Sequence, residues 1–205
     1  MKLYTSAAPN PFRVEIFLAE KGVEVEREQI NIMAGETRSS EFHALNSLEE
    51  VPMLALDDGT LITESVAICR YLDGTYPEPP LCGTDPQSCA IIEMWNRRIE
   101  QQIMDPAAQV GRHTISLFAD KFEQVPAYAE TQRRLFVQRL GWLDEELADG
   151  RAFVAGSAFS IADITGMAAF KVCDFTDQSV PAELANVKRW ETALRKRPSW
   201  AAWPQ

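Results

Sequence analysis

Residues 51–66 read VPMLALDDGTLITESV, and this stretch decides how the first half of the chain folds. The apolar runs at 53–56 and 60–62 are too short for helices, and the Asp58-Gly59 pair between them is a strong tight-turn signal. The two runs therefore predict a β-hairpin. A helix is expected directly afterwards, because the small and acidic residues at 63–65 suit a helix start and apolar residues recur over the next two turns.

Pro52 lies just before the first strand of this hairpin, and it cannot donate to a β-ladder. A cis Val51–Pro52 bond would turn the Val51 backbone outward, where it can pair with an extended ligand. The following helix start would offer free N–H groups and a positive dipole to a carboxylate of the same ligand, and Glu64 would take an ammonium group. The alternative is a trans proline before an ordinary hairpin, and trans is the commoner isomer.

Two motifs in this region, V-P-x-L at 51–54 and T-E-S-x-A-I-x-x-Y-L at 63–72, resemble the glutathione-binding half of glutathione transferases. That half is a thioredoxin-like domain. In the family, the residue before a cis-proline pairs with the cysteinyl backbone of glutathione, and a Glu-Ser pair holds its γ-glutamyl end. The resemblance implies these binding roles for Val51, Pro52, Glu64 and Ser65, and it extends over essentially the whole chain.

The composition excludes several classes of partner. The chain has 205 residues, 46% of them hydrophobic, which is enough for one large domain or two small ones. Its formal net charge is −10 and its pI is near 4.8. Non-specific binding to nucleic acid or to an anionic membrane needs clustered cations, so the charge argues against both partners.

The chain begins without the apolar core of a signal peptide, and it has no apolar run that is long enough to span a bilayer. We therefore expect a cytoplasmic protein. The cysteines form no C-x-x-C pair and no metal-like spacing with the two histidines, so we expect reduced, isolated thiols and no metal site. The cysteines are Cys69, Cys82, Cys89 and Cys173.

The first third of the chain predicts a strand, a helix and a second strand. Residues 2–5 read as a strand, and Pro11 suits the first turn of a helix that ends at Lys21-Gly22. Residues 23–32 roughly alternate between apolar and polar, as a strand does. A right-handed crossover makes the two strands parallel in one sheet.

Residues 40–45 predict one short helix, and the hairpin and the helix from 64 to about 76 follow it. The order is βαβ, a connection, and then ββα, which is the thioredoxin order. The Pro-rich segment that follows ends the helix sharply. We therefore expect an α/β thioredoxin-like domain at residues 1–76 and an interdomain linker at 77–86.

Residues 87–205 lack strand character and predict an all-α C-terminal helical bundle, because apolar residues recur at helical spacing through them. One helix start is well specified: Ser160 suits the N-cap, and Asp163 lies three residues on, where it can reach back. The sequence S-x-A-D at this place is also a hallmark of the C-terminal domain of glutathione transferases.

A glutathione-using enzyme must favour the thiolate of its substrate, and an ordinary thiol has a pKa near 8.5. The candidate donors to the sulfur lie in the first loop and are Thr5, Ser6 and Asn10. In serine- and cysteine-type transferases the catalytic residue would fall on Ala8, so the usual side chain is missing. Asn10 is the best candidate, because relatives resembling the bacterial nu class have a Pro-Asn here whose amide points toward the sulfur.

Each of these residues also has a structural explanation. Asn10 would cap the first helix, Ser6 would be a turn residue, and Glu64 would be an acid at a helix N-terminus. Many relatives have Gly-Lys or Gly-Gln before the Val-Pro, where a cation or amide meets the glycyl carboxylate of glutathione. Glu50 would repel that carboxylate, so either Arg38 or a basic residue elsewhere compensates, or the affinity for glutathione is weak.

The second substrate is expected against the all-helical half, with Phe12 contributing from the first helix and Trp95, Arg98, Arg112 and His113 from the bundle. The function expected from the resemblance is conjugation of the glutathione thiolate to small, mostly apolar electrophiles by a homodimer. Two alternatives stay open. One is glutathione-dependent reduction of disulfides or peroxides, and the other is a non-catalytic binding protein on the same scaffold.

Overall fold

The computed structural model describes every residue except 122 and 205, and the described residues fall into two compact units. The first unit contains residues 1–81 and 198–204, and the second contains residues 82–197. We describe each unit separately.

The end of the chain differs from the expected division. Residues 198–204 were expected in the helical domain, but they group with the first unit. The physical reason is that Trp200 and Trp203 pack against Phe12 on the first helix. The other expected boundaries remain a proposal.

The first unit is built on a four-stranded sheet with the strand order β2-β1-β3-β4. β1 is parallel to β2 and antiparallel to β3, and β4 is antiparallel to β3. Leu54 lies opposite Ile62, so the predicted hairpin is confirmed. The strands are β1 (Lys2–Thr5), β2 (Glu26–Gln29), β3 (Met53–Ala55) and β4 (Leu61–Thr63).

β2 is shorter than the strand predicted at residues 23–32. Its ladder runs from Lys2 opposite Glu26 to Thr5 opposite Gln29, so the pairing ends where the four residues of β1 end. The apolar residues that suggested a longer strand lie outside the ladder: Val25 and Ile30 are buried, and Val23 and Ile32 are half-buried.

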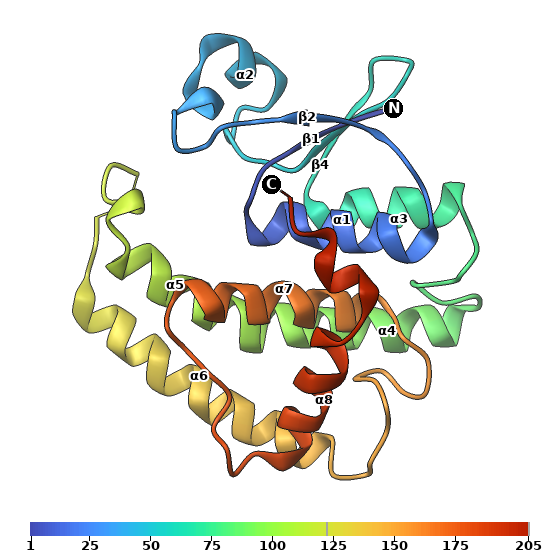
Figure 1. Cartoon of the computed structure of the whole chain (residues 1–205), viewed down its shortest axis with the longest axis vertical. Helices are drawn as coiled ribbons and strands as arrows, with labels where there is room; N and C mark the ends of the chain where they lie inside the picture. Colours follow the sequence, from blue (N-terminus) through green and yellow to red (C-terminus); the bar gives the residue numbers. More distant parts are fainter. Residues whose placement is uncertain (122, 205) are drawn as a thin grey trace. The chain divides into compact units, whose positions relative to one another are not determined.

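The helices of this unit follow the thioredoxin-like order, and α1 and α3 lie side by side along one face of the sheet (Figure 1). α1 ends as predicted, with Gly22 at φ 63° in the left-handed conformation that glycine adopts without strain. The elements are α1 (Pro9–Lys21), the 3₁₀ turn η1 (Glu36–Arg38), α2 (Ser40–Leu45), α3 (Ser65–Thr75) and the 3₁₀ helix η4 (Pro198–Ala202).

The two faces of the sheet have separate apolar cores because side chains alternate along a strand. Leu3 and Leu54 are opposite each other and fully buried. Their neighbours Tyr4 and Met53 point to the other face, where they pack around Phe42 of α2. Tyr4 is thus part of a packed cluster.

Lys21 ties the end of α1 to the segment that follows α3. Its side chain is fully buried, and its ammonium pairs with Asp73 at 2.5 Å. It also donates to the carbonyl oxygens of Tyr76 and Pro79 at 2.8 and 2.5 Å. A buried cation is tolerated when acceptors of this kind surround it.

The second unit consists of helices. The apolar residues at helical spacing that predicted a bundle are mostly buried, which confirms the prediction. α4 continues through a π-helical turn into α5 without leaving helical geometry. The elements are α4 (Pro86–Ile99), the π-helical turn η2 (Glu100–Met104), α5 (Asp105–Thr114), the 3₁₀ turn η3 (Ser116–Phe118), α6 (Pro126–Glu146), α7 (Ile161–Phe175) and α8 (Ala185–Arg195).

α7 is the central helix of this unit, and most of its residues are buried. Its predicted N-terminal capping box is present, with Ser160 as the N-cap and Asp163 accepting the Ser160 N–H at 3.0 Å. Gly166 lies under the Trp190 ring of α8, and a Cβ there would collide with that ring. A polar contact is also enclosed, because Thr165 Oγ1 donates to Asn96 Oδ1 of α4 at 2.6 Å.

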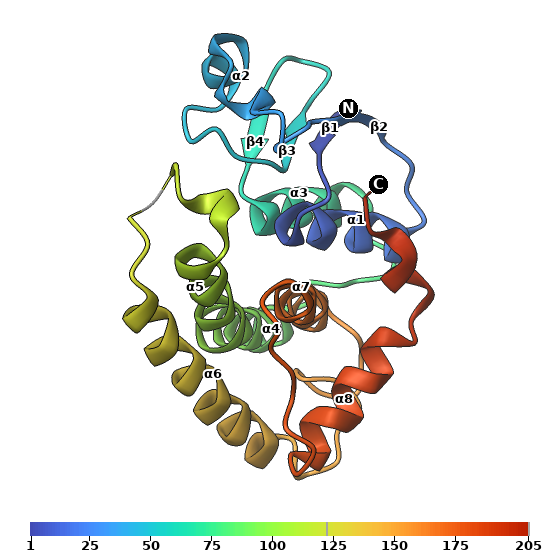
Figure 2. The ribbon, with the colours of Figure 1, turned by 60° about the vertical axis from the view of Figure 1, so that its left-hand side comes forward.

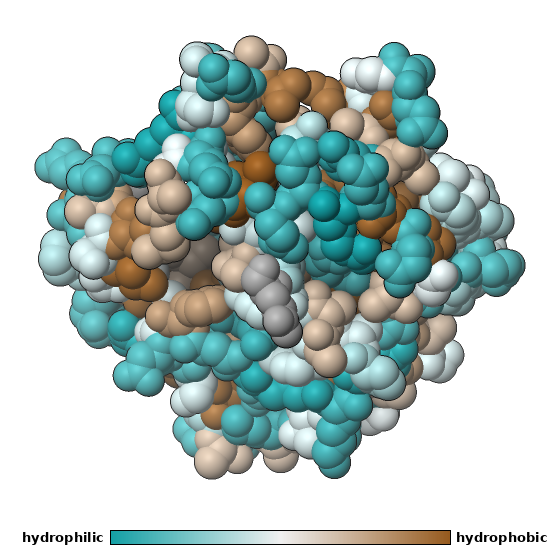
Figure 3. Space-filling view, turned by 45° about the horizontal axis from the view of Figure 1, so that its top comes forward, coloured by the Kyte–Doolittle hydropathy of each residue, from teal (hydrophilic) through white to brown (hydrophobic). Residues whose placement is uncertain are grey.

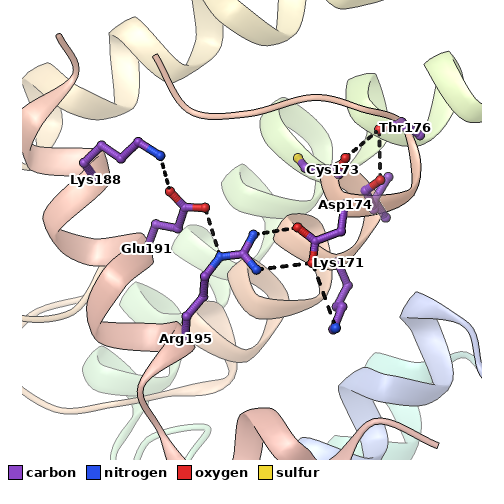
Figure 4. A network of polar contacts seen from close by, with 8 residues as sticks. Lys171, Cys173, Asp174, Thr176, Lys188, Glu191 and Arg195 are labelled. Atoms are coloured by element: carbon purple, nitrogen blue, oxygen red, sulfur yellow. Dashed lines mark hydrogen bonds and ion pairs between the residues drawn. The ribbon is translucent and has the colours of Figure 1, made fainter. Parts of the chain in front are cut away.

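An ion-pair network joins α7 to α8, as Figure 4 shows. Arg195 of α8 lies between Asp174 of α7 and Glu191, at 2.8 and 3.0 Å respectively. The thiol of Cys173 lies next to this network, and its burial, together with Asp174 and Glu191, raises its pKa to about 12. This thiol therefore stays protonated and unreactive at neutral pH.

The four cysteines are free thiols in the structure. Within the described part of the chain, no helix has the length and apolar character needed to cross a bilayer. On the face seen in Figure 3, hydrophilic residues predominate and hydrophobic residues form separate patches between them.

Candidate functional site

The Val51 backbone lies at the start of the hairpin, and the Val51–Pro52 bond is cis, as the resemblance implied. The Val51 side chain packs on the cluster around Phe42. Among the described residues, we find no hydrogen bond made by the Val51 N–H or C=O. Neither backbone group is thus engaged by a described residue, which is what pairing with an extended ligand would require.

Glu64 occupies an unusual backbone conformation at the junction of β4 and α3. Its φ is 66° and its ψ is 113°, although it is not a glycine. Backbone angles of this kind are costly for a residue with a Cβ and are concentrated at functional sites. The Glu64 side chain is exposed, and it stands beside the positive end of the α3 dipole.

Ser65 is the first residue of α3, and only 5% of it is exposed. Its Oγ accepts a hydrogen bond from Arg13 Nη1 at 2.7 Å. Because the hydroxyl accepts this bond, its own proton is directed elsewhere and can be donated to a ligand oxygen. A helix N-terminus with a hydroxyl beside it has the donors that a carboxylate needs.

The sequence interpretation missed Arg13, which is 1% exposed and joins α1 to the start of α3. The signal that was available is its position within an apolar run, between Phe12 and Val14. From the sequence, an arginine at this position would be predicted to be an exposed helix residue. Its burial follows from the fold, which places the Ser65 hydroxyl next to it.

The three candidate donors from the first loop differ in their burial. Thr5 is fully buried, and Ser6 is 8% exposed. Asn10 is exposed, and its side chain is not the cap of α1, because Ala8 is the N-cap residue and makes no side-chain capping bond. The capping explanation for Asn10 is thus wrong. Asn10 lies three residues before Arg13, so the two share a face of α1.

Glu50 is exposed, and its backbone carbonyl accepts from Asn46 Nδ2 at 2.8 Å. The backbone of Glu49 has a φ of 57°, and its carboxylate lies 3.2 Å from Nδ1 of His43. Residues 1–81 contain fourteen acidic and six basic residues, so this unit carries most of the net negative charge of the chain. Arg38 is exposed, and the structure shows no contact that assigns it to the site.

Phe12 does not face a substrate, which corrects the expectation from the sequence. Its side chain is fully buried, and the rings of Trp200 and Trp203 cover it. Trp95 is likewise a core residue of the second unit, stacked on Trp142 at 6.1 Å with Arg98 over its ring.

His113 lies at the end of α5, and its ring is engaged within the second unit. Its Nδ1 accepts from the Val125 N–H at 3.1 Å, and its ring packs edge-on against Tyr128. Arg112 is half-buried on the same helix. Among the described residues, no group of three or more His, Cys, Asp and Glu side chains is arranged to hold a metal ion.

Comparisons with known proteins give a consistent result over the whole chain. Residues 1–74 match the family model described as "Glutathione S-transferase, N-terminal domain", and residues 103–198 match the model described as "Glutathione S-transferase, C-terminal domain". Glutathione S-transferase 2 of Saccharomyces cerevisiae is 36% identical over 199 residues, which are 95% of this chain and 85% of that protein.

Solved structures agree with the sequence relatives. A glutathione S-transferase domain-containing protein of Marinobacter aquaeolei superposes with a TM-score of 0.92 at 37% identity, covering 98% of this chain and 100% of the other. Gtt2 of Saccharomyces cerevisiae superposes with a TM-score of 0.91 at 35% identity, covering 98% and 99%.

Proposed function

The chain belongs to the glutathione S-transferase family, and from this premise we propose that it conjugates the thiolate of glutathione to small, mostly apolar electrophiles. The observation that carries the proposal is the Val51 backbone, which no described residue bonds, in the same unit as the Ser65 hydroxyl, which accepts from Arg13 at 2.7 Å. A γ-linked tripeptide needs both features, because it presents an extended backbone and a terminal carboxylate.

In the proposed complex, the backbone of Val51 pairs with the cysteinyl N–H and C=O of glutathione, and Pro52 shapes that edge. The α-carboxylate of the γ-glutamyl residue lies at the start of α3, where it accepts from the Ser65 hydroxyl and meets the positive end of the helix dipole. The Glu64 carboxylate takes the ammonium group. Arg13 positions the Ser65 hydroxyl without touching the ligand.

The chemistry proposed for the sulfur is electrostatic. The Asn10 amide donates a hydrogen bond to the thiolate, which favours the charged form and lowers the pKa of the bound thiol. The thiolate then attacks an electrophilic carbon of the second substrate. A C–S bond forms as a leaving group departs with its electron pair, or as the π electrons of an activated double bond move to the electron-withdrawing group, which then takes a proton from solvent. Ser6, which is almost buried, is the second candidate donor.

Asn10→Ala is expected to lower turnover about tenfold, the loss of one hydrogen bond to a charged group, while the KM for glutathione changes by less than about threefold. Because the donor favours the thiolate, the midpoint of the pH–rate profile should move to higher pH. Asn10→Asp is the matched control: it keeps the size, removes the donor and adds a repelling charge, so it should be slower still. A raised KM with unchanged turnover would mean that Asn10 binds glutathione instead.

The wild-type protein provides the direct test of the proposed function. Glutathione at 100 times its dissociation constant should stabilise the fold by about 2.7 kcal/mol, which raises the melting temperature by roughly 5–10 °C. Cysteinylglycine, which lacks the γ-glutamyl group, should give a much smaller shift. Conjugation to a chromogenic aryl halide should be faster than reduction of hydroxyethyl disulfide.

The three outcomes that contradict the proposal point to different alternatives. Reduction that is tenfold or more faster than conjugation would assign the protein to the disulfide reductases. A glutathione shift without either activity would favour a non-catalytic binding protein. If millimolar glutathione leaves the melting temperature unchanged, the glutathione site itself is wrong.

The proposal extends to assembly and location. The family resemblance supports a cytoplasmic homodimer, and one face of α4 offers apolar surface for it. Ile91 and Met94, one helical turn apart on α4, are 39% and 40% exposed. Side chains of this size are usually buried in a stable protein or at an interface.

A further inference from the structure

Residues 198–204, the C-terminal segment, lie along α1 in the first unit. The segment consists of η4 followed by Trp203 and Pro204, and Figures 1 and 2 both show this end of the ribbon beside α1. It reaches the first unit after the chain has completed all the helices of the second. The thioredoxin-like order of strands and helices does not require it.

The contacts of the segment extend along most of α1. The Phe12 ring lies 5.1 Å from Trp203 and 5.7 Å from Trp200, both in edge-on geometry, and it is fully buried. Two turns further along α1, Ser199 Oγ donates to Glu20 Oε1 at 2.5 Å. Edge-on aromatic pairs are specific in geometry, so they hold the Phe12 ring in one orientation.

The first turn of α1 needs this support. Its N-cap is Ala8, which makes no side-chain capping bond, and Pro9 and Pro11 have no N–H to donate, so few hydrogen bonds hold this turn. A helix start without a cap frays unless tertiary packing holds it. Phe12 belongs to this turn, and it lies directly before Arg13 and two residues after Asn10.

We propose that Trp200 and Trp203 are positioning residues of the glutathione site. They fix Phe12, which holds the first turn of α1 and thereby keeps the Arg13 guanidinium on the Ser65 hydroxyl. The C-terminal segment is thus part of the glutathione-binding unit. This proposal rests on the proposed function, because it concerns the affinity of that site.

The test is the double substitution Trp200→Ala with Trp203→Ala, assayed well below the melting temperature of each variant. The KM for glutathione and its dissociation constant should both rise about fivefold, the effect of weakening one ordinary hydrogen bond. The double substitution of both tryptophans by phenylalanine keeps ring contacts on Phe12 and should restore most of the affinity. A purely structural role would lower the melting temperature and leave both constants unchanged.

Trp142→Ala is the matched control. Trp142 is also half-buried and also makes a ring contact, stacked on Trp95 at 6.1 Å, but it belongs to the second unit. Its loss should lower the melting temperature while the dissociation constant of glutathione stays within about twofold of wild type. An equal loss of affinity in this control would overturn the proposal.

The remaining outcomes are also decisive. Wild-type affinity in the folded double alanine variant would overturn the proposal and leave the proposed function intact. Wild-type protein that does not bind glutathione would overturn both. If the double variant does not fold, Trp203→Ala alone keeps the Trp200 contact, and unchanged affinity in that folded variant overturns the proposal.

Discussion

Ser65→Ala is expected to weaken glutathione binding roughly 10- to 100-fold, because a hydrogen bond to a charged group contributes about 1.5–3 kcal/mol. The substitution removes the donor to the γ-glutamyl carboxylate. It also removes the group that Arg13 contacts at 2.7 Å inside the protein. Both effects act on ligand binding, so turnover at saturating glutathione should fall by less than about threefold.

The measurement is the dissociation constant of glutathione by calorimetry, together with steady-state constants for conjugation. Ser39→Ala is the matched control, because Ser39 is also a serine at a helix start in the first unit. Its Oγ accepts from the Phe42 N–H at 3.1 Å as the N-cap of α2. That variant should lose about 1 kcal/mol of stability and keep its glutathione affinity. Equal affinity losses in the two variants would remove Ser65 from the site.

The fold was predictable where its signals are local. The Asp58-Gly59 turn predicted the hairpin, and Gly22 predicted the end of α1, because each position needs a specific backbone conformation. The capping box at Ser160 is also a local pattern, and the structure contains it. The length of β2 was not predictable, since it depends on the length of the strand it pairs with.

The candidate site was predictable only in part, for the same reason. The motif around Val51 and Ser65 is contiguous, so the sequence displays it. Arg13 meets Ser65 from another helix, 52 residues away in sequence. Trp200 and Trp203 reach Phe12 from the far end of the chain. Contacts of this kind follow from the tertiary fold, and neither periodicity nor spacing indicates them.

Asp163→Asn is expected to lower the free energy of unfolding by roughly 3 kcal/mol, the cost of leaving buried donors without acceptors. Asp163 is fully buried, and its carboxylate accepts four hydrogen bonds. Oδ1 accepts from Val154 N–H and Trp190 Nε1–H, both at 2.9 Å, and Oδ2 accepts from the N–H and hydroxyl of Ser160 at 3.0 and 3.1 Å. In either orientation, an asparagine NH₂ group faces two of these donors.

Asp85→Asn is the matched control for this substitution. Asp85 is also an aspartate at a helix start in the second unit, where it caps α4 by accepting from Gln87 and Ser88. Asparagine caps helices about as well as aspartate, and Asp85 is exposed, so the change should cost less than about 0.5 kcal/mol. Denaturant unfolding of both variants measures the difference. Similar losses of unfolding free energy in the two variants would mean that the burial of Asp163 does not determine the cost of its substitution.

The pH dependence gives a second readout of the same group. Burial raises the pKa of Asp163 to about 6, although its four hydrogen bonds oppose the shift. The folded protein therefore binds this proton more tightly than the unfolded chain. The contribution of this proton to the free energy of unfolding is fully present below pH 4 and is lost as the pH rises through 6.

Protonated Asp163 keeps its neighbours satisfied, because the Ser160 hydroxyl can rotate to accept the carboxyl proton while the backbone N–H groups still find oxygens. An asparagine cannot do this, and it does not titrate. The stability difference between wild type and Asp163→Asn should therefore be larger at pH 5 than at pH 7.5, by an amount on the order of 1–3 kcal/mol for a shift of about two pKa units. A difference that grows with pH would mean that the pKa of Asp163 is lower in the folded protein than in the unfolded chain.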